Sequence, residues 1–76
     1  MTPAQSRAAR GLISMSQTDL AKAAGLGPST VIDFERERRT VARPSIDAMQ
    51  TALESAGVLF LPENGGGAGV RLRGKI

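Results

Sequence analysis

Hydrophobic residues recur at helical spacing in four separate segments of this 76-residue chain. The first segment begins with Thr2 as a helix cap, with Pro3 at the first helical position and Gln5 three residues after the cap. We expect this helix to run to about Leu12. One stripe along it carries the residues Ser6, Ala9, Arg10 and Ile13.

Two shorter helices follow, separated by a tight connection that contains glycine. The residues from Ser16 to Asp19 form a second capping box, and Gly25 is the residue type that ends a helix in the left-handed conformation. Pro28 opens the next helix at a position where its missing N–H group loses no hydrogen bond. The inner face of the second helix carries Leu20, Ala21 and Ala24.

The third helix has two different faces, and one of them combines apolar residues with a carboxylate. Val31, Phe34 and Glu35 share that face at spacings of three and four residues. In the first helix, Arg10 is likewise a charged residue on a stripe with the apolar residues Ala9 and Ile13. Because a lone buried charge is costly, we expect Arg10 and Glu35 to form a partly buried, hydrogen-bonded pair. The opposite face, here called the outward face, carries Ser29, Ile32, Asp33 and Arg36.

The C-terminal part of the chain predicts a fourth helix and a short hairpin. Pro44 restarts a helix that ends at Gly57, and two β-like runs follow at residues 58–61 and 70–73. The fold class is therefore mainly α, with residues 1–57 as a four-helix domain and residues 58–76 as a C-terminal β-hairpin tail. The apolar face of the fourth helix carries Ile46, Met49, Leu53 and Ala56.

The net charge of +3 lies in one stretch, residues 36–43, here called the basic segment. It holds four arginines and one glutamate, whereas the rest of the chain has six basic and six acidic residues. Such a cluster at a helix end favours a polyanionic partner, although a solvated arginine-rich loop gives the same composition. The four arginines are Arg36, Arg38, Arg39 and Arg43.

The composition argues against several other classes of function. The chain has no Cys and no His, so we expect no metal site and no cofactor. It has no Trp or Tyr and only two Phe, which is too little for stacking on unpaired bases. We assemble no nucleophile–base pair and expect no enzyme. No apolar run of about 18 residues spans a membrane, and the lack of a signal sequence and of cysteines makes the cytoplasm the expected location.

Two short helices joined by a glycine-containing turn are typical of a helix-turn-helix. The residues QTDLA at 17–21, AG at 24–25, STV at 29–31 and FER at 34–36 are similar to the Xre/Cro-like phage-repressor family. The resemblance covers roughly residues 3–57. It implies a lambda-repressor-like fold and a sequence-specific regulator of transcription that binds double-stranded DNA. Glu37 departs from the family, where glycine is common, so either the helix continues through Glu37 or the turn takes another route.

The resemblance also implies which residues contact DNA. Gln17 and Thr18 begin the second helix, where the family's matching Gln contacts phosphate. The third helix, residues 28–37, would enter the major groove, and the arginines of the basic segment would reach flanking phosphates. Asp33 can accept from cytosine, and the alternative is that it pairs locally with Arg36 or Arg7. The residues expected to meet base edges are Pro28, Ser29, Thr30, Ile32 and Asp33.

The apolar tail bears on association. A lone two-stranded hairpin is barely stable in water, so it must pack on the helices or pair its edge with another copy. We favour a homodimer that uses the tail, with or without the fourth helix, on a palindromic operator; a monomer with a packed hairpin is the alternative. A different class of function is a protein-binding antiactivator or antitoxin. Ile32 and Asp33 on the outward face keep that interpretation open, and the basic segment weighs against it.

Overall fold

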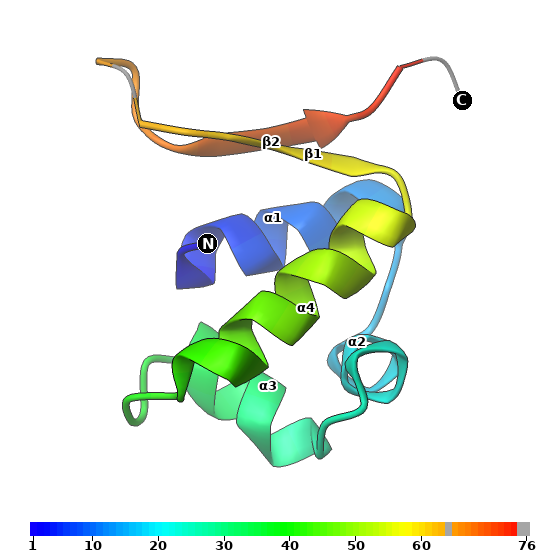
Figure 1. Ribbon diagram of the computed structural model, residues 1–76, viewed down its shortest axis with the longest axis vertical. Coiled ribbons are helices and arrows are strands. Elements are labelled where there is room, and N and C mark those ends of the chain that lie inside the picture. The colour runs from blue at the N-terminus through cyan, green and yellow to red at the C-terminus, as the bar shows by residue number, and fades with distance from the viewer. Residues whose placement is uncertain (64, 75–76) are drawn as a thin grey trace.

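Residues 1–63 and 65–74 are described by a computed structural model, in which four helices precede a two-stranded hairpin (Figure 1). The predicted fold class is confirmed. The hairpin lies across α1 and α4, while α2 and α3 lie at the opposite end of the molecule (Figure 1). The elements are α1 (Pro3–Ile13), α2 (Gln17–Ala24), α3 (Pro28–Glu35), α4 (Arg43–Ser55), β1 (Val58–Leu61) and β2 (Gly69–Leu72).

Both predicted capping boxes are present. Thr2 Oγ1 accepts from the backbone N–H of Gln5 at 3.1 Å, and Gln5 Oε1 accepts from the N–H of Thr2 at 2.8 Å. Ser16 and Asp19 make the same reciprocal contacts at the start of α2. Gly25 ends α2 with a φ of 72°, in the left-handed region that glycine enters without steric cost. These local signals fix the beginning of α1 and both ends of α2.

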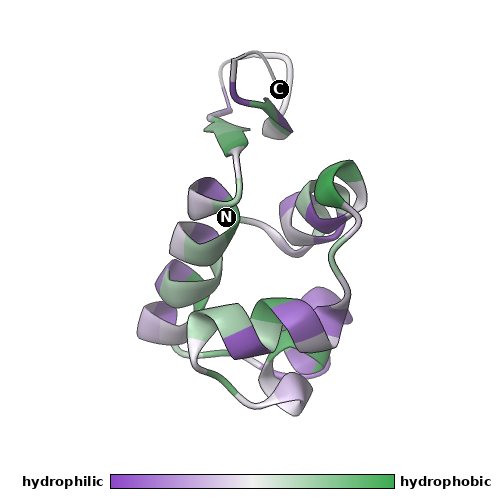
Figure 2. Cartoon of the chain, turned by 90° about the vertical axis from the view of Figure 1, so that its right-hand side faces the viewer, coloured by the Kyte–Doolittle hydropathy of each residue, from purple (hydrophilic) through white to green (hydrophobic). Residues whose placement is uncertain are grey.

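The core lies among the four helices, and Val58 extends it to the hairpin. In Figure 2 the helices carry both hydrophobic and hydrophilic residues, as expected of helices that bury one face. Ala56 was expected on the apolar face of α4 but is exposed, because α4 ends at Ser55 and Ala56 only caps it. The buried hydrophobic residues are Ala9, Leu20, Ala21, Val31, Phe34, Val41, Met49, Leu53 and Val58.

The third helix ends two residues before the end of the range of about 28–37, so of the two alternatives at Glu37 the structure has the turn and not the continuing helix. Its last helical residue is Glu35, and Glu37 has a φ of 55°, in the left-handed region. The N–H of Glu37 donates to the carbonyl of Phe34 at 3.1 Å, and that of Arg38 donates to the carbonyl of Asp33 at 2.9 Å. The chain therefore turns back onto the end of α3 with Glu37 in the conformation that glycine adopts most easily.

The hairpin packs on the helices of its own chain. β1 and β2 pair antiparallel with Phe60 opposite Val70, and β2 lies one residue earlier than the predicted 70–73. Arg73 lies just after the strand, and its N–H donates to the carbonyl of Gly57 at 2.7 Å. Val58 is part of the core, so no gap in packing separates the helices from the tail. The predicted tail also includes residues 64, 75 and 76, which lie outside the described residues.

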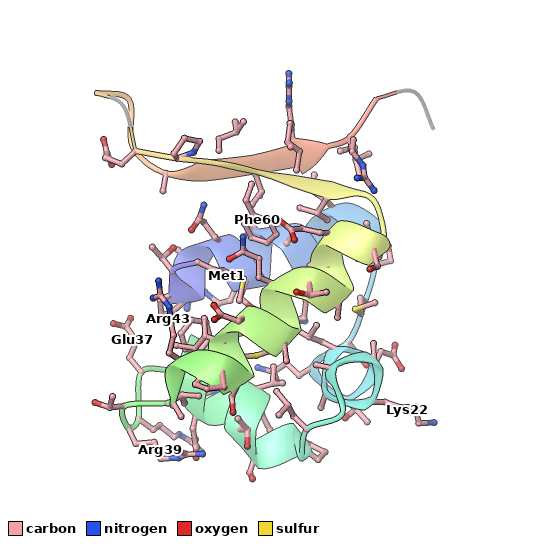
Figure 3. The ribbon with its side chains drawn as sticks, in the orientation of Figure 1. Met1, Lys22, Glu37, Arg39, Arg43 and Phe60 are labelled. Atoms are coloured by element: carbon pink, nitrogen blue, oxygen red, sulfur yellow. The ribbon has the colours of Figure 1, made fainter. Side chains whose placement is uncertain are left out.

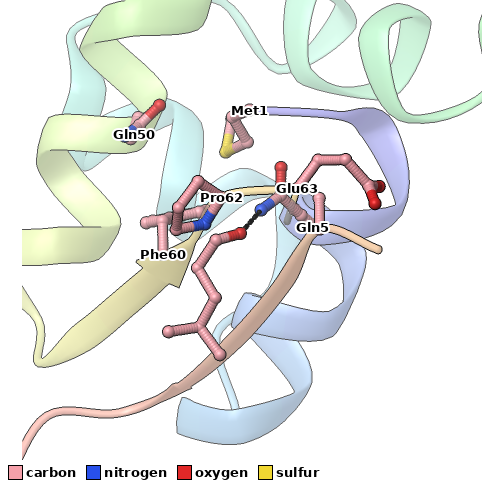
Figure 4. A pocket seen from close by; sticks show the side chains of 8 residues that line it. Met1, Gln5, Gln50, Phe60, Pro62 and Glu63 are labelled. Carbon is pink, nitrogen blue, oxygen red and sulfur yellow. Dashed lines mark hydrogen bonds between the residues drawn. The ribbon is translucent and has the colours of Figure 1, made fainter. Parts of the chain in front are cut away.

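A hollow of about 280 Å³ lies beside the turn end of the hairpin (Figure 4). The Gln5 side chain crosses one side of it, where Nε2 donates to the carbonyls of Gly69 at 3.0 Å and Leu61 at 3.4 Å. The Glu63 carboxylate accepts from the N–H of Gly67 at 2.9 Å and so stabilises the turn between the strands. Gln5 thus joins the hairpin to α1, and Glu63 stabilises the turn within the hairpin.

Candidate nucleic-acid interface

The two faces of α3 are sharply different in burial. Val31, Phe34 and Glu35 are buried, as their spacing predicts. The outward face and the first turn remain accessible, so α3 presents a mixed polar and apolar surface beside the start of the basic segment. Among the predicted base-contacting residues, Pro28 and Ser29 are exposed, and Thr30, Ile32 and Asp33 are half-buried.

The start of α2 presents Thr18 to solvent, but the side chain of Gln17 is turned partly inward. Gln17 Nε2 donates to Glu35 Oε1 at 3.1 Å, so the residue implied to contact phosphate also joins the interior of the domain. An amide nitrogen carries two N–H groups, and this contact uses one of them. The N-terminus of α2 in addition offers backbone N–H groups and the positive end of the helix dipole.

The basic segment projects its arginines from a backbone that is anchored in the core. Val41 is buried, while Arg36 and Arg38 are exposed and the side chain of Arg39 is 50% exposed. Figure 3 shows Glu37, Arg39 and Arg43 on one side of the molecule and Lys22 on the opposite side. Positive charge therefore gathers at the end of α3.

Arg43 belongs to α4 and not to the loop in which the sequence placed it. It is the first residue of the helix, with Ala42 as the cap. A cation is unfavourable at the positive end of a helix dipole. The carboxylate of Asp47, one turn later, lies 3.6 Å from Arg43 Nε and offsets part of that effect. The Arg43 side chain is 80% exposed and remains accessible to a polyanion.

Asp33 is paired with arginines of the basic segment. Its Oδ2 accepts from Arg39 Nε at 2.9 Å, and its Oδ1 lies 4.0 Å from Arg38 Nη1. The sequence suggested Arg36 or Arg7 as local partners. The turn at Glu37 brings the later arginines back toward α3 instead, and Arg7 donates to the carbonyl of Glu35.

Glu35 lies at the centre of a buried hydrogen-bond network. Its side chain is 1% exposed and accepts two bonds from Arg10, with Nη2 at 2.7 Å and Nε at 2.9 Å. Ser6 donates a further bond at 2.5 Å, and Gln17 completes the set. Arg10 also donates to the carbonyl of Met15. Within the described residues, no buried side-chain nitrogen or oxygen lacks a hydrogen-bond partner.

These contacts set the ionisation of the pair. Burial alone would raise the pKa of Glu35, but the hydrogen bonds from Arg10, Ser6 and Gln17 outweigh it and hold the pKa below its ordinary value. The hydrogen bond to Glu35 raises the pKa of Arg10. The pair is thus a fixed ionic contact between α1 and α3 that also includes the start of α2.

Sequence reasoning missed two contributions from α1. Ser6 was placed on the stripe of Arg10, but its bond to Glu35 was not foreseen. A small polar residue on the same stripe as a buried charge was the available signal. Gln5 was assigned only to the cap, and nothing local indicates its second contact with the hairpin, since Gly69 is 64 residues away.

Residues 1–63 and 65–74 contain no group of three His, Cys, Asp or Glu side chains arranged to hold a metal ion. In the same part of the chain, no helix has the length and apolar character needed to cross a bilayer.

Comparison with known proteins identifies a family. A family model described as helix-turn-helix matches residues 7–57, which is more than half of the chain. The matched region runs from α1 to the end of α4 and includes the α2–turn–α3 unit and the basic segment. No curated protein matches the chain.

Proposed function

Because the chain belongs to the Xre/Cro-like helix-turn-helix family of DNA-binding regulatory proteins, we propose that it regulates transcription by binding a specific double-stranded DNA sequence, with α3 in the major groove. The observation that carries the proposal is the accessible outward face of α3 next to the exposed arginines of the basic segment. Groove-reading and phosphate-binding groups then lie on adjacent elements, as a duplex requires.

Direct base reading in this arrangement rests on a few short side chains. Ser29 can donate to or accept from a base edge, and Ile32 can contact a thymine methyl group. Neither is the bidentate type of contact that Arg makes with guanine. Sequence-dependent DNA shape and the spacing of half-sites therefore carry much of the proposed specificity.

Phosphate contacts position the domain on the duplex. The proposed groups are Gln17 and Thr18 at the start of α2, and Arg36, Arg38, Arg39 and Arg43 around the end of α3. Each neutralised phosphate adds about −0.9 to the slope of log affinity against log salt concentration, so binding weakens steeply with salt.

The proposal includes a homodimer on a palindromic site. One face of the hairpin packs on the helices, whereas Leu61 and Leu72 are each 37% exposed and the sheet has two outer edges. A second copy pairing at this edge buries apolar surface and links two recognition helices. Half-sites in such dimers are about 34 Å apart, or a multiple of that. Sedimentation at several concentrations tests this part independently of DNA.

The test of DNA binding is a gel-shift titration of the DNA upstream of the protein's own gene, at two salt concentrations. Arg43→Ala should weaken binding and flatten its salt dependence, because one phosphate contact of an arginine that Asp33 does not hold is lost. Lys22→Ala is the matched control, since it removes one positive charge from the opposite side of the molecule (Figure 3). It should leave the binding curve almost unchanged.

Two outcomes contradict the proposal. Equal effects of the two substitutions indicate attraction by net charge rather than an oriented interface. Absence of DNA binding, together with tight capture of a purified regulator or toxin, supports the protein-binding class of antiactivators and antitoxins instead.

A further inference from the structure

We propose that Asp33 is an internal counter-anion that competes with DNA phosphates for the arginines of the basic segment. It would limit how strongly the domain binds DNA of any sequence. This inference rests on the proposed DNA-binding function. It assigns to Asp33 a positioning role that differs from the base contact suggested by its place on α3.

The geometry joins the basic segment to Asp33 through both side chain and backbone. The carboxylate accepts from Arg39 Nε at 2.9 Å and lies 4.0 Å from Arg38 Nη1. The carbonyl of the same residue accepts from the N–H of Arg38 at 2.9 Å. One residue thus holds the loop against the end of α3 and faces two of its four arginines.

The turn at Glu37 makes this arrangement possible. With a φ of 55°, Glu37 reverses the chain immediately after α3, so that Arg38 and Arg39 return toward Asp33. A continuing helix would place those two residues further along α3 and prevent the backbone contact. The left-handed turn at Glu37 therefore brings Arg38 and Arg39 next to Asp33.

The contact between Asp33 and its arginines is exposed enough for a phosphate to reach the arginines and exchange with the carboxylate. The Asp33 side chain is 21% exposed, so its carboxylate is partly shielded from water, whereas Arg38 and Arg39 are 55% and 50% exposed. An arginine has five N–H donors, and Nε of Arg39 is the atom that faces Asp33. A phosphate arriving at this surface meets arginines whose charge a neighbouring carboxylate already balances in part.

The other carboxylate paired with the basic segment is less suited to this role. Asp47 is 63% exposed and lies 3.6 Å from an 80% exposed Arg43, which is an ordinary pair within one helix face. In the described part of the chain, Arg36 has no carboxylate within ion-pair distance. Among the carboxylates paired with the basic segment, Asp33 is therefore the one whose neutralisation releases the larger number of arginines.

The experiment uses the full chain and a labelled duplex of about 20 base pairs with an arbitrary sequence, since the competition does not depend on an operator. Affinity is measured by fluorescence anisotropy between about 50 mM and about 200 mM salt. Asp33→Asn should steepen the slope of log affinity against log salt by about 0.9 for each arginine that gains a phosphate. If the variant and the wild type bind equally near 1 M salt, one such contact makes the variant bind about tenfold more tightly than the wild type near 50 mM salt.

Two control variants separate competition from other effects. Glu54→Gln makes the same change in net charge on an exposed residue of α4, whose side chain accepts a bond from Gln50. It should keep the wild-type slope. Asp33→Glu retains a carboxylate at the same position and should also restore a slope close to that of the wild type. Circular dichroism checks that each variant is folded.

Each remaining outcome has a defined meaning. If Asp33→Asn and Glu54→Gln show equal slopes and affinities, or if Asp33→Asn binds more weakly than the wild type, the inference is overturned while DNA binding stands. If neither the wild type nor any variant binds a duplex, the proposed function itself fails. In the free protein, the Arg39 Nε–H proton should exchange with solvent more slowly in the wild type than in Asp33→Asn, and equal exchange rates would also overturn the inference.

Discussion

Two carboxylate–arginine pairs lie two residues apart on α3 and have opposite surroundings. Glu35 is 1% exposed and bonded to an Arg10 that is 19% exposed, whereas Asp33 is 21% exposed and bonded to an Arg39 that is 50% exposed. Both contacts join a carboxylate to a guanidinium group, although Glu35 accepts two bonds from Arg10 and Asp33 accepts one from Arg39. Their consequences differ because removing a partner from the buried pair leaves an uncompensated charge, while water and salt screen the exposed pair.

The largest expected effect is the loss of the buried pair. Arg10→Met should lower the free energy of unfolding by on the order of 3–5 kcal/mol, because Glu35 would be left buried without its main partner. A loss of this size is a large fraction of the stability of a small domain. Urea unfolding measures the difference. Arg71→Met, on the exposed part of β2, is the control, and a wild-type midpoint for Arg10→Met would contradict the prediction.

Acid should weaken the buried pair next. The pKa of Glu35 is lower in the folded than in the unfolded chain, so its contribution to stability is full above the unfolded value of about 4.3 and is lost as pH falls through the folded value. The urea midpoint should therefore drop between about pH 7 and about pH 3. The drop should be smaller in Glu35→Gln, which has no carboxylate to titrate at this position. An equal drop in both proteins would show that other groups cause the loss of stability in acid.

The backbone strain of the turn at Glu37, just after the two paired carboxylates, can be removed by substitution. Glu37 has a φ of 55°, a conformation that costs a residue with a side chain about 1–2 kcal/mol. Part of that is offset by the greater freedom of glycine in the unfolded chain, so Glu37→Gly should stabilise the domain by about 0.5–1 kcal/mol. Glu37→Gln makes the same change in charge without relieving the backbone. A gain in urea midpoint for both variants would point to charge, and not to the turn.

The smallest expected effect on stability belongs to the exposed pair. Asp33→Asn should change the free energy of unfolding by less than about 1 kcal/mol, because solvent already screens the contact with Arg39. Urea unfolding beside Arg10→Met makes the comparison direct. A loss similar to that of Arg10→Met would show that Asp33 holds the fold together, and its proposed effect on DNA binding would then need a different explanation.

The sequence was most informative where the signals are local. Capping residues fixed the start of α1 and α2, and the placement of charged residues on apolar stripes pointed to Arg10 and Glu35. Prediction was weaker at the end of α3, where Arg36 to Arg38 have no strong helix-stopping residue. There the helix was expected to reach residue 37 and ends at Glu35. The partners of Asp33 were misjudged for the same reason.

The sequence by itself determined which segments are helical, which of their faces are apolar and where positive charge accumulates, because each depends on residues within a turn or two of one another. Only the tertiary structure decided that Gln5 holds the hairpin, that Gln17 reaches Glu35 and that Asp33 faces Arg39. Those contacts depend on the path of the chain between elements. That path is set by packing of the whole core and by a single left-handed residue at position 37, neither of which local spacing reveals.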